Sequence, residues 1–479
     1  ALPVAPTSPP TDPAPKLVSE NTATHWPDMG QMLGSLFVCE LPSPPKASPE
    51  ASPQSITVLG LGLHPHTLPA AHHQLIHTAQ VLAGGQALLN RFPEAPAERI
   101  PLSAALDTAL MALEQRYYAG QSVVVLADGD PLFFGIGATL ARRLGPQALR
   151  IFPAVSSLQE ACARLALPWH DVACVSLHGR NSFHALNGAV IADKHVCLLT
   201  DARYSPDKIA RHLLDRGVDW FDAHIFENLN GPNEQHHHLP LREVVGNAFG
   251  PVATLLLIPA RPPRRPASGI PDAALATEGG LLTKGPVRAA ALALLRVHPH
   301  HTVWDVGAGS GAVSLEASAL AHQGCVVAFE RDSGRALCIK ENRRRFGAAN
   351  LEIITGEAPQ CLYQLPTPDR IFVGGGLNGD AAHDILTTLT EALPAGGRLV
   401  ISCVLLGSLH LACEFLRQRH WPVEITALQA SQSVPLAGDL RFNALNPVFL
   451  VSTEKACRQD GEALHPHSAG ERNYEGKYR

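Results

Sequence analysis

A glycine-rich turn in the second half of the chain carries the clearest chemical signal. Gly307 to Gly311 (GAGSG) follow an apolar stretch that begins at Thr302 and precede a stretch with helical periodicity. Glycines let the backbone approach a ligand closely, and the start of the next helix offers unpaired N–H groups. An acid, Glu330, stands about 20 residues beyond the turn, where an acid binds ribose hydroxyls in nucleotide-binding folds. The spacing predicts a site for a nucleotide-like cofactor.

Two kinds of cofactor compete for this turn, and a glycine turn without a ligand is the third interpretation. Nicotinamide dehydrogenases normally show G-x-G-x-x-G, whereas this chain shows G-x-G-x-G after an acid, Asp305. The second form resembles the class I S-adenosylmethionine methyltransferases, in which the turn cradles the methionine end of the cofactor. The resemblance implies a set of cofactor-binding residues: Gly307, Ala308, Gly309, Ser310, Gly311 and Glu330.

Three further motifs narrow this resemblance. They are LLTKGPVR (281–288), GEAP (356–359) and DRIFVGGG (369–376). Together they are similar to the corrin-ring C15-methyltransferase and decarboxylase domains, and the resemblance implies that Thr283, Glu357 and Ala358 touch the cofactor. The chain departs from that family twice, since Glu357 replaces the usual Asp and the loop at 374–378 reads GGGLN instead of GGSGG.

The first half resembles the tetrapyrrole (class III) methyltransferases. The motifs are ITVLGLG (56–62), ADGDPLFFG (127–135), PAVSSLQEACARL (153–165) and FENLNGPNE (226–234). In that family, a GDP-type turn and a Ser-rich turn line a cleft between two α/β lobes, and the cofactor lies folded within it. The resemblance, strongest to the corrin C5 branch, implies a second set of cofactor-binding residues: Gly60, Gly62, Asp128, Gly129, Asp130, Ser156 and Ser157. One departure is Leu63-His64-Pro65, where relatives more often place Gly-Pro.

The elements that must position these motifs alternate between strand and helix, which predicts α/β layers in both halves. An amphipathic stretch follows the first strand at 69–83, a helix capped by Ser156 or Ser157 begins near 157, and two late strands near 423–429 and 448–452 predict an antiparallel edge hairpin. We expect five segments: a disordered Pro-rich extension (1–54), a two-lobed tetrapyrrole methylase domain (55–258), a stiff linker (259–268), a Rossmann-like class I methyltransferase domain (269–453) and a flexible tail (454–479).

Composition excludes several classes of protein. Hydrophobic residues make up 46% of the chain, which can form a sizeable core, and the net charge of −5 argues against a nucleic-acid binder. No apolar run reaches the ~18 residues of a membrane helix. The 10 cysteines form no C-x-x-C pair and indicate buried thiols in a reducing cytosol. The 24 histidines have no Cys or carboxylate at ligand spacing, so no metal site is expected.

In this order, the two halves resemble the fused methyltransferases of cobalamin biosynthesis. The resemblance implies that the chain methylates precorrin-6Y or precorrin-6B at C5 and C15 and removes the carboxyl of the C12 acetate to give precorrin-8. It implies S-adenosylmethionine at two sites, one per domain, and a tetrapyrrole as the binding partner. Because class III domains often pair, it also implies a homo-oligomer, while the composition indicates a cytoplasmic protein without nucleic-acid or membrane partners.

The substrate of such an enzyme carries several carboxylates, which Lys and Arg side chains bind well. Lys284, Arg288 and Arg331 flank the cofactor motifs and are the candidates for substrate positioning. Two alternatives stay open: a methyltransferase acting on RNA or protein, and a tetrapyrrole-binding protein without catalytic activity. The missing NPPY-like loop after Phe372 argues against the first, and two intact cofactor turns argue against the second.

Overall fold

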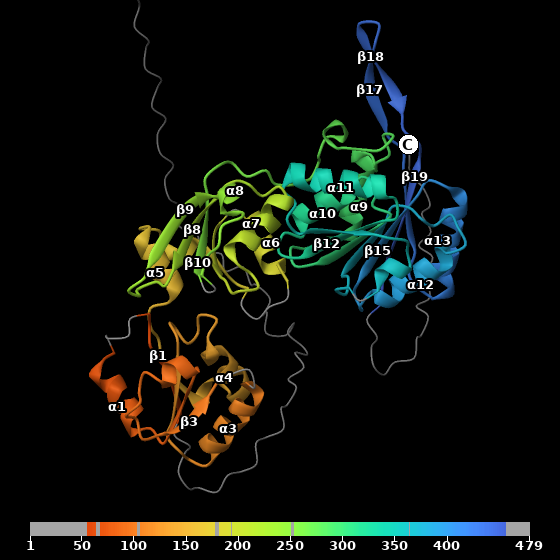
Figure 1. Ribbon diagram of the computed structural model, residues 1–479. Helices are drawn as coiled ribbons and strands as arrows, with labels where there is room; N and C mark the ends of the chain where they lie inside the picture. The colour runs from red at the N-terminus through yellow and green to blue at the C-terminus, as the bar shows by residue number, and fades with distance from the viewer. Residues whose placement is uncertain are drawn as a thin grey trace, which may run out of the picture. The chain divides into compact units, whose positions relative to one another are not determined.

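The computed structural model of the chain describes residues 55–63, 68–102, 106–177, 182–192, 194–250, 253–363 and 365–456 (Figure 1). The extension expected at 1–54 and all but the first three residues of the tail expected at 454–479 lie outside these residues. Three sheets with flanking helices follow one another along the chain, and each is described by itself.

The first sheet is wholly parallel, in the order β3-β2-β4-β1-β5. Its strands are β1 (Ile56–Gly60), β2 (Val81–Gly84), β3 (Glu98–Pro101), β4 (Val123–Ala127) and β5 (Leu149–Phe152). Its helices are α1 (Ala70–Thr78), α2 (Gln86–Leu89), α3 (Leu106–Tyr118) and α4 (Ile136–Leu144). Apolar residues of α1 and α2 cover one face and those of α3 and α4 the other, so β1 and β4 are buried along their whole length.

The amphipathic stretch at 69–83 is helical only as far as Thr78. Val81–Gly84 forms β2 instead, because it fits between β3 and β4 and its residues are buried there.

The second sheet is mixed, in the order β6-β7-β10-β8-β9, with only β6 and β7 parallel. Its strands are β6 (Val172–Ser176), β7 (His195–Leu199), β8 (Phe221–Glu227), β9 (Gln235–Pro240) and β10 (Ala253–Pro259). Helix α5 (Ser157–Arg164) packs on one face. The other face packs against α6 (His184–Ile191), α7 (Pro206–Asp215) and α8 (Leu241–Val244). Ser156 caps α5 in a reciprocal box with Gln159, as the sequence predicted.

The third sheet has seven strands in the order β13-β12-β11-β14-β15-β19-β16. Five are parallel: β11 (Thr302–Val306), β12 (Cys325–Glu330), β13 (Leu351–Thr355), β14 (Arg370–Val373) and β15 (Arg398–Cys403). Helices α9 (Gly285–Leu295), α10 (Ala312–Leu320) and α11 (Ser333–Phe346) pack on one face, and α12 (Ala382–Ala392) and α13 (Leu406–Gln418) on the other (Figure 1). Short 3-10 helices lie at 146–148, 169–171, 272–274 and 360–362. These sheets confirm the predicted α/β fold class.

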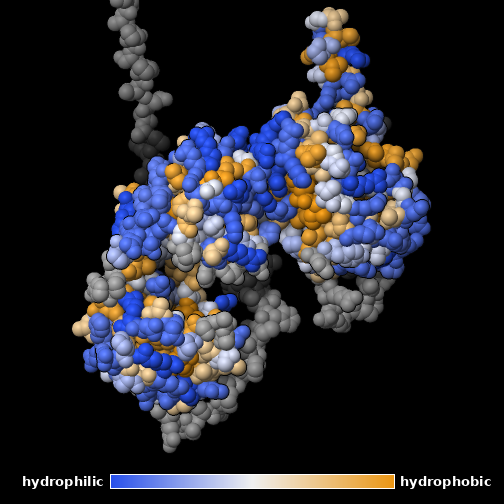
Figure 2. Space-filling model, in the orientation of Figure 1, coloured by the Kyte–Doolittle hydropathy of each residue, from blue (hydrophilic) through white to orange (hydrophobic). Residues whose placement is uncertain are grey.

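The expected edge pair is present, with an insertion that the sequence did not indicate. β16 (Glu424–Leu428) and β19 (Val448–Glu454) pair antiparallel at the edge. Between them, β17 (Ser431–Leu436) and β18 (Asp439–Ala444) form a separate ribbon that projects from the body of its domain (Figure 1). Hydrophobic and hydrophilic residues share the ribbon's surface (Figure 2), and Phe442 is 79% exposed.

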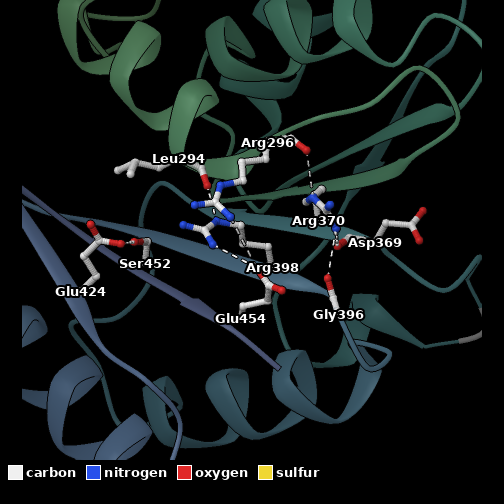
Figure 3. A network of polar contacts seen from close by, with 9 residues as sticks. All are labelled: Leu294, Arg296, Asp369, Arg370, Gly396, Arg398, Glu424, Ser452 and Glu454. Carbon is white, nitrogen blue, oxygen red and sulfur yellow. Dashed lines mark hydrogen bonds and ion pairs between the residues drawn. The ribbon is translucent and has the colours of Figure 1, made fainter. Parts of the chain in front are cut away.

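A network of arginines ties the end of α9 to the sheet (Figure 3). The buried Arg398 donates hydrogen bonds to the carbonyl of Leu294 and, at 3.1 Å, to the carboxylate of Glu454. Arg370 donates to the carbonyl of Arg296 at 3.2 Å. Since these bonds anchor the C-terminal end of α9, they also fix the direction in which its N-terminal end presents Thr283 and Lys284.

Candidate active site

The described residues of the third sheet enclose a cavity of about 870 Å³ at the carboxyl ends of its parallel strands. This is the edge at which α/β sheets bind their ligands, and the volume suits a small organic ligand. The wall combines segments that lie far apart in the chain: the glycine turn, the ends of β12 and β14, the segment before α9 and the chain that follows β18.

The glycine turn lines this cavity with bare backbone. Gly307 has a φ of +71°, and a Cβ atom there would lie 3.0 Å from the backbone nitrogen of Gly375. Gly309 has a φ of +59°, and a Cβ atom there would meet nothing within 4 Å. Gly307 is therefore required for close packing of two loops, whereas Gly309 leaves room for a ligand to approach the backbone.

Glu330, at the end of β12, is only 3% exposed and is held in a fixed orientation. Its carboxylate accepts hydrogen bonds from the backbone N–H groups of Gly309 (2.8 Å) and Asp332 (3.0 Å). The guanidinium of Arg335 lies 3.1 Å from the same carboxylate. A carboxylate has about four acceptor positions, so one remains for a ligand hydroxyl group.

Two buried polar atoms beside the turn have no hydrogen-bond partner among the described residues: Oδ1 of Asp305 and Oγ of Ser310. Burial raises the pKa of Asp305 to about 7, although the Ser314 hydroxyl donates a hydrogen bond to its other oxygen and opposes this shift. Buried polar atoms normally have partners. Neither Asp305 nor Ser310 lines the cavity, so the fit to a ligand with ribose hydroxyls and an amino-acid end rests on the bare backbone at Gly309 and the Glu330 carboxylate.

Of the three residues predicted at the start of α9, two line the cavity and one is buried away from it. Thr283 and Lys284 line the cavity, but Arg288 is 0% exposed and does not. Its guanidinium donates to Glu316 at 2.8 Å, to Asp272 at 2.6 Å and to the carbonyl of Thr283 at 2.6 Å. The helical spacing of α9 turns Arg288 toward the core, where the buried Glu316 of α10 balances its charge. Arg288 therefore cannot contact a substrate in this cavity, and it orients Thr283 instead.

The GEAP turn lies next to Glu330. The N–H of Gly356 donates to the carbonyl of Glu330 at 3.1 Å, and both Glu357 and Ala358 line the cavity. Arg331 also lines it, with its guanidinium 3.6 Å from the carboxylate of Glu357. Both side chains of this pair are largely exposed, so Arg331 is free to reach an anionic ligand.

Several residues of the site escaped the sequence analysis. Asn342 is fully buried on α11, and its amide donates to the carbonyls of Ser310 and Ala276, both at 2.9 Å. A buried amide on an otherwise apolar helix face was the available signal. Arg335 and Asp380 and the residues 444–446 also line the cavity. These residues reach the cavity only because segments far apart in the chain pack together, and the sequence around each of them does not indicate this.

In the first sheet, the loops that follow β1, β4 and β5 meet at the carboxyl edge. Gly62 and Gly129 form a backbone bridge, and a Cβ atom on Gly60 would lie 2.8 Å from the carbonyl oxygen of Gly129. The carboxylate of Asp130 accepts hydrogen bonds from the N–H groups of Leu132 (2.8 Å) and Ala154 (3.2 Å). These contacts bring the predicted glycines and Asp130 together, and they show that Asp130 shapes the turn.

The remaining predicted residues of this half differ in exposure. Asp128 is exposed beside the turn. Ser156 is 4% exposed, and its hydroxyl is used by the capping box of α5, whose first residue is Ser157. Ser156 therefore positions the start of α5 and has little freedom to turn toward a ligand.

The described residues contain no cluster of three or more His, Cys, Asp or Glu side chains that could hold a metal ion. Within the same residues, every helix is too short or too polar to cross a bilayer. The eight cysteines among them are all free thiols.

Comparison with known families finds one match in each half of the chain. A family of tetrapyrrole (corrin/porphyrin) methylases matches residues 55–245. A precorrin methyltransferase domain family matches residues 274–455.

Three curated relatives illustrate the similarity. A precorrin-6Y C(5,15)-methyltransferase (decarboxylating) of Sinorhizobium sp is 34% identical over 60% of this chain and 69% of its own length. A cobalt-precorrin-7 C(5)-methyltransferase of Salmonella typhimurium is 38% identical over 40% of this chain and 92% of its own. A cobalt-precorrin-6B C(15)-methyltransferase (decarboxylating) of the same species is 35% identical over 36% of this chain and 89% of its own.

Proposed function

The chain belongs to the family of decarboxylating precorrin-6Y C(5,15)-methyltransferases, and from that premise we propose the reaction it performs. The chain methylates precorrin-6Y or its reduced form, precorrin-6B, at C5 and C15 and removes the carboxyl of the C12 acetate, which gives precorrin-8 in cobalamin biosynthesis. The observation that carries this proposal is the meeting of Gly307 to Gly309, Glu330 and Lys284 around one cavity, with Ser310 and Gly311 behind its wall.

Like its family, the chain is an S-adenosylmethionine-dependent methyltransferase. The bound cofactor supplies an electrophilic methyl group on a sulfonium. In the second half, the residues we assign to its binding are Thr283, Gly307 to Gly311, Glu330, Glu357 and Ala358. In the first half, a second site would use Gly60, Gly62, Asp128, Gly129, Asp130 and Ser157, with Ser156 holding the start of α5 in place. The convergence of the loops after β1, β4 and β5 supports this second site.

The task of the protein in methyl transfer is to position the acceptor carbon and to exclude water. An electron-rich carbon of a reduced tetrapyrrole needs little deprotonation before it attacks. Lys284 and Arg331 line the cavity and are suited to bind the peripheral carboxylates of the ring. Loss of the acetate carboxyl releases carbon dioxide and leaves the electron pair of the broken bond, which the conjugated ring takes up once it is protonated. The protein therefore has to hold the ring while a proton is supplied to it.

We also propose that the protein works as a homo-oligomer in the cytoplasm. The exposed apolar side chains of the β17–β18 ribbon, Leu436, Leu440 and Phe442, support self-association. The free thiols support a reducing compartment. Light scattering on the purified chain tests the first point, and a monomeric mass would contradict it.

Incubation with precorrin-6B and S-adenosylmethionine, followed by mass spectrometry, tests the reaction. We expect the product to gain two methyl groups and to lose one carbon dioxide. Calorimetric titration with the cofactor separates this function from that of a non-catalytic tetrapyrrole-binding protein. Two binding events support the enzyme with two sites, and no binding event would contradict it.

A further inference from the structure

Three consecutive apolar residues lie exposed where β15 ends and α13 begins. Val404, Leu405 and Leu406 are 65%, 53% and 77% exposed. A run of exposed apolar residues is costly in water and usually marks a binding surface. Val404 also lines the cavity. The run therefore begins at the wall of the candidate active site, and Leu405 and Leu406 follow Val404 directly in the chain.

Apolar side chains from two other segments line the same cavity. Leu281, before α9, is 62% exposed, and Leu445 follows the β17–β18 ribbon. We call Leu281, Val404, Leu405, Leu406 and Leu445 the apolar rim. No helix or strand among the described residues buries its most exposed members, so the rim is available to a ligand that enters the cavity.

The charges beside the rim indicate what that ligand is. Lys284 lies three residues after Leu281, and Arg331 lines the same cavity with a largely exposed side chain. An apolar surface next to two cations is complementary to a ring system with apolar faces and anionic edges. Glu330, which lines the same cavity, is only 3% exposed, whereas the rim residues Leu281 and Val404 are largely exposed.

We propose that Leu281, Val404, Leu405 and Leu406 form the platform on which the tetrapyrrole ring lies during C15 methylation and decarboxylation. This inference rests on the proposed function and assigns the ring-binding surface within it. Contact between the ring face and the rim removes water from both and fixes the height of C15 above the methyl donor. The rim therefore sets substrate affinity in the second half of the chain and leaves the C5 reaction unaffected.

The test replaces two rim residues that line the cavity, in the full-length protein. We expect Leu281→Ser combined with Val404→Ser to raise the KM for precorrin-6B in the C15 reaction roughly 10- to 100-fold. The kcat at saturation, the calorimetric affinity for S-adenosylmethionine and the C5 reaction stay at wild-type values. Combined Leu281→Met and Val404→Met substitutions keep the apolar surface and restore a near wild-type KM. Leu337→Ser, at an equally exposed leucine of α11 outside the cavity, is the matched control.

The possible outcomes distinguish a failure of the ring platform from a failure of the proposed function. An unchanged KM in the serine variant of an active enzyme overturns the platform and leaves the proposed function standing. A change of oligomeric mass with unchanged C15 kinetics also overturns it, because the surface is then a contact between copies of the chain. A wild-type protein that modifies no tetrapyrrole at either carbon refutes the proposed function, and the platform falls with it.

Discussion

The carboxylate of Glu330 accepts a hydrogen bond of 2.8 Å from the backbone N–H of Gly309. This bond joins the loop after β11 to the end of the neighbouring strand β12. The acid predicted to bind ribose therefore also holds the turn predicted to cradle the rest of the cofactor. One side chain supports both parts of the site, and its loss should affect both.

Glu330→Gln should weaken S-adenosylmethionine binding to the second half roughly 10- to 100-fold, because hydrogen bonds to a charged acceptor are worth about 1.5–3 kcal/mol. Glutamine retains one acceptor oxygen for Gly309 but loses the charge that pairs with Arg335. Calorimetry should show one of two binding events weakened, while C5 methylation continues. Glu341→Gln, at an exposed glutamate of α11, is the control. Equal affinities in both variants would falsify the assignment of Glu330 to the cofactor.

Lys284→Ala should weaken C15 methylation or decarboxylation and spare C5 methylation, because the ammonium group lines the cavity of the second half alone. We expect an increase of roughly 10-fold in KM, the range of a single charge-assisted contact. Product masses over time measure each reaction. Lys340→Ala, at an exposed lysine of α11 outside the cavity, should behave as wild type. Unchanged double methylation and carboxyl loss in Lys284→Ala would rule out this role.

Arg288→Met should destabilise the second half by about 3–5 kcal/mol, because it leaves the buried carboxylate of Glu316 without its charged partner. The midpoint of urea unfolding, followed by tryptophan fluorescence, measures the loss. Arg417→Met, at an exposed arginine of α13, is the control and should change stability by less than about 0.5 kcal/mol. If the two variants unfold at the same urea concentration, the buried pair of Arg288 and Glu316 does not contribute to the free energy of unfolding as we expect.

Asp305 should make the stability of its domain depend on pH. The pKa of an unfolded Asp is about 3.9, whereas burial raises the pKa of Asp305 to about 7 in the fold. Between these values, the folded state holds a proton that the unfolded state has lost. Stability therefore falls as the pH rises through this window, by up to about 1.4 kcal/mol per pH unit, and is level above it.

Asp305→Asn cannot titrate, so its urea midpoint should lack this slope between about pH 5 and about pH 7. Asp384→Asn, at an exposed carboxylate of α12, should retain the wild-type slope. A wild-type slope in Asp305→Asn would show that another group is responsible.

The cofactor turn and its acid could be predicted from the sequence because their signal is local. The glycines follow a buried strand directly, and Glu330 ends the next one. Arg288 could not be placed in this way. Its role depends on Glu316, which lies on another helix and meets it only when α9 and α10 pack on the sheet.

The short strands β2 and β3 and the β17–β18 ribbon escaped prediction for a related reason. β2 and β3 have four residues each and pair with strands from elsewhere in the chain. The ribbon is almost entirely exposed, so it lacks the alternation of buried and exposed residues that reveals a strand. The apolar rim likewise combines distant segments. The domain boundaries expected from the sequence stay predictions.

The close approach of Gly307 to the loop after β14 limits how this protein can change. A Cβ atom on Gly374 would lie 2.9 Å from the carbonyl oxygen of Gly307, and one on Gly307 would lie 3.0 Å from the nitrogen of Gly375. Neither glycine can acquire a side chain without displacing the other loop, whatever methyl donor the cavity holds. At Gly309 an added Cβ atom would meet nothing within 4 Å, but the φ of +59° strains any side chain there. A redesign for another donor would therefore have to change the side chains that line the cavity and keep all three glycines.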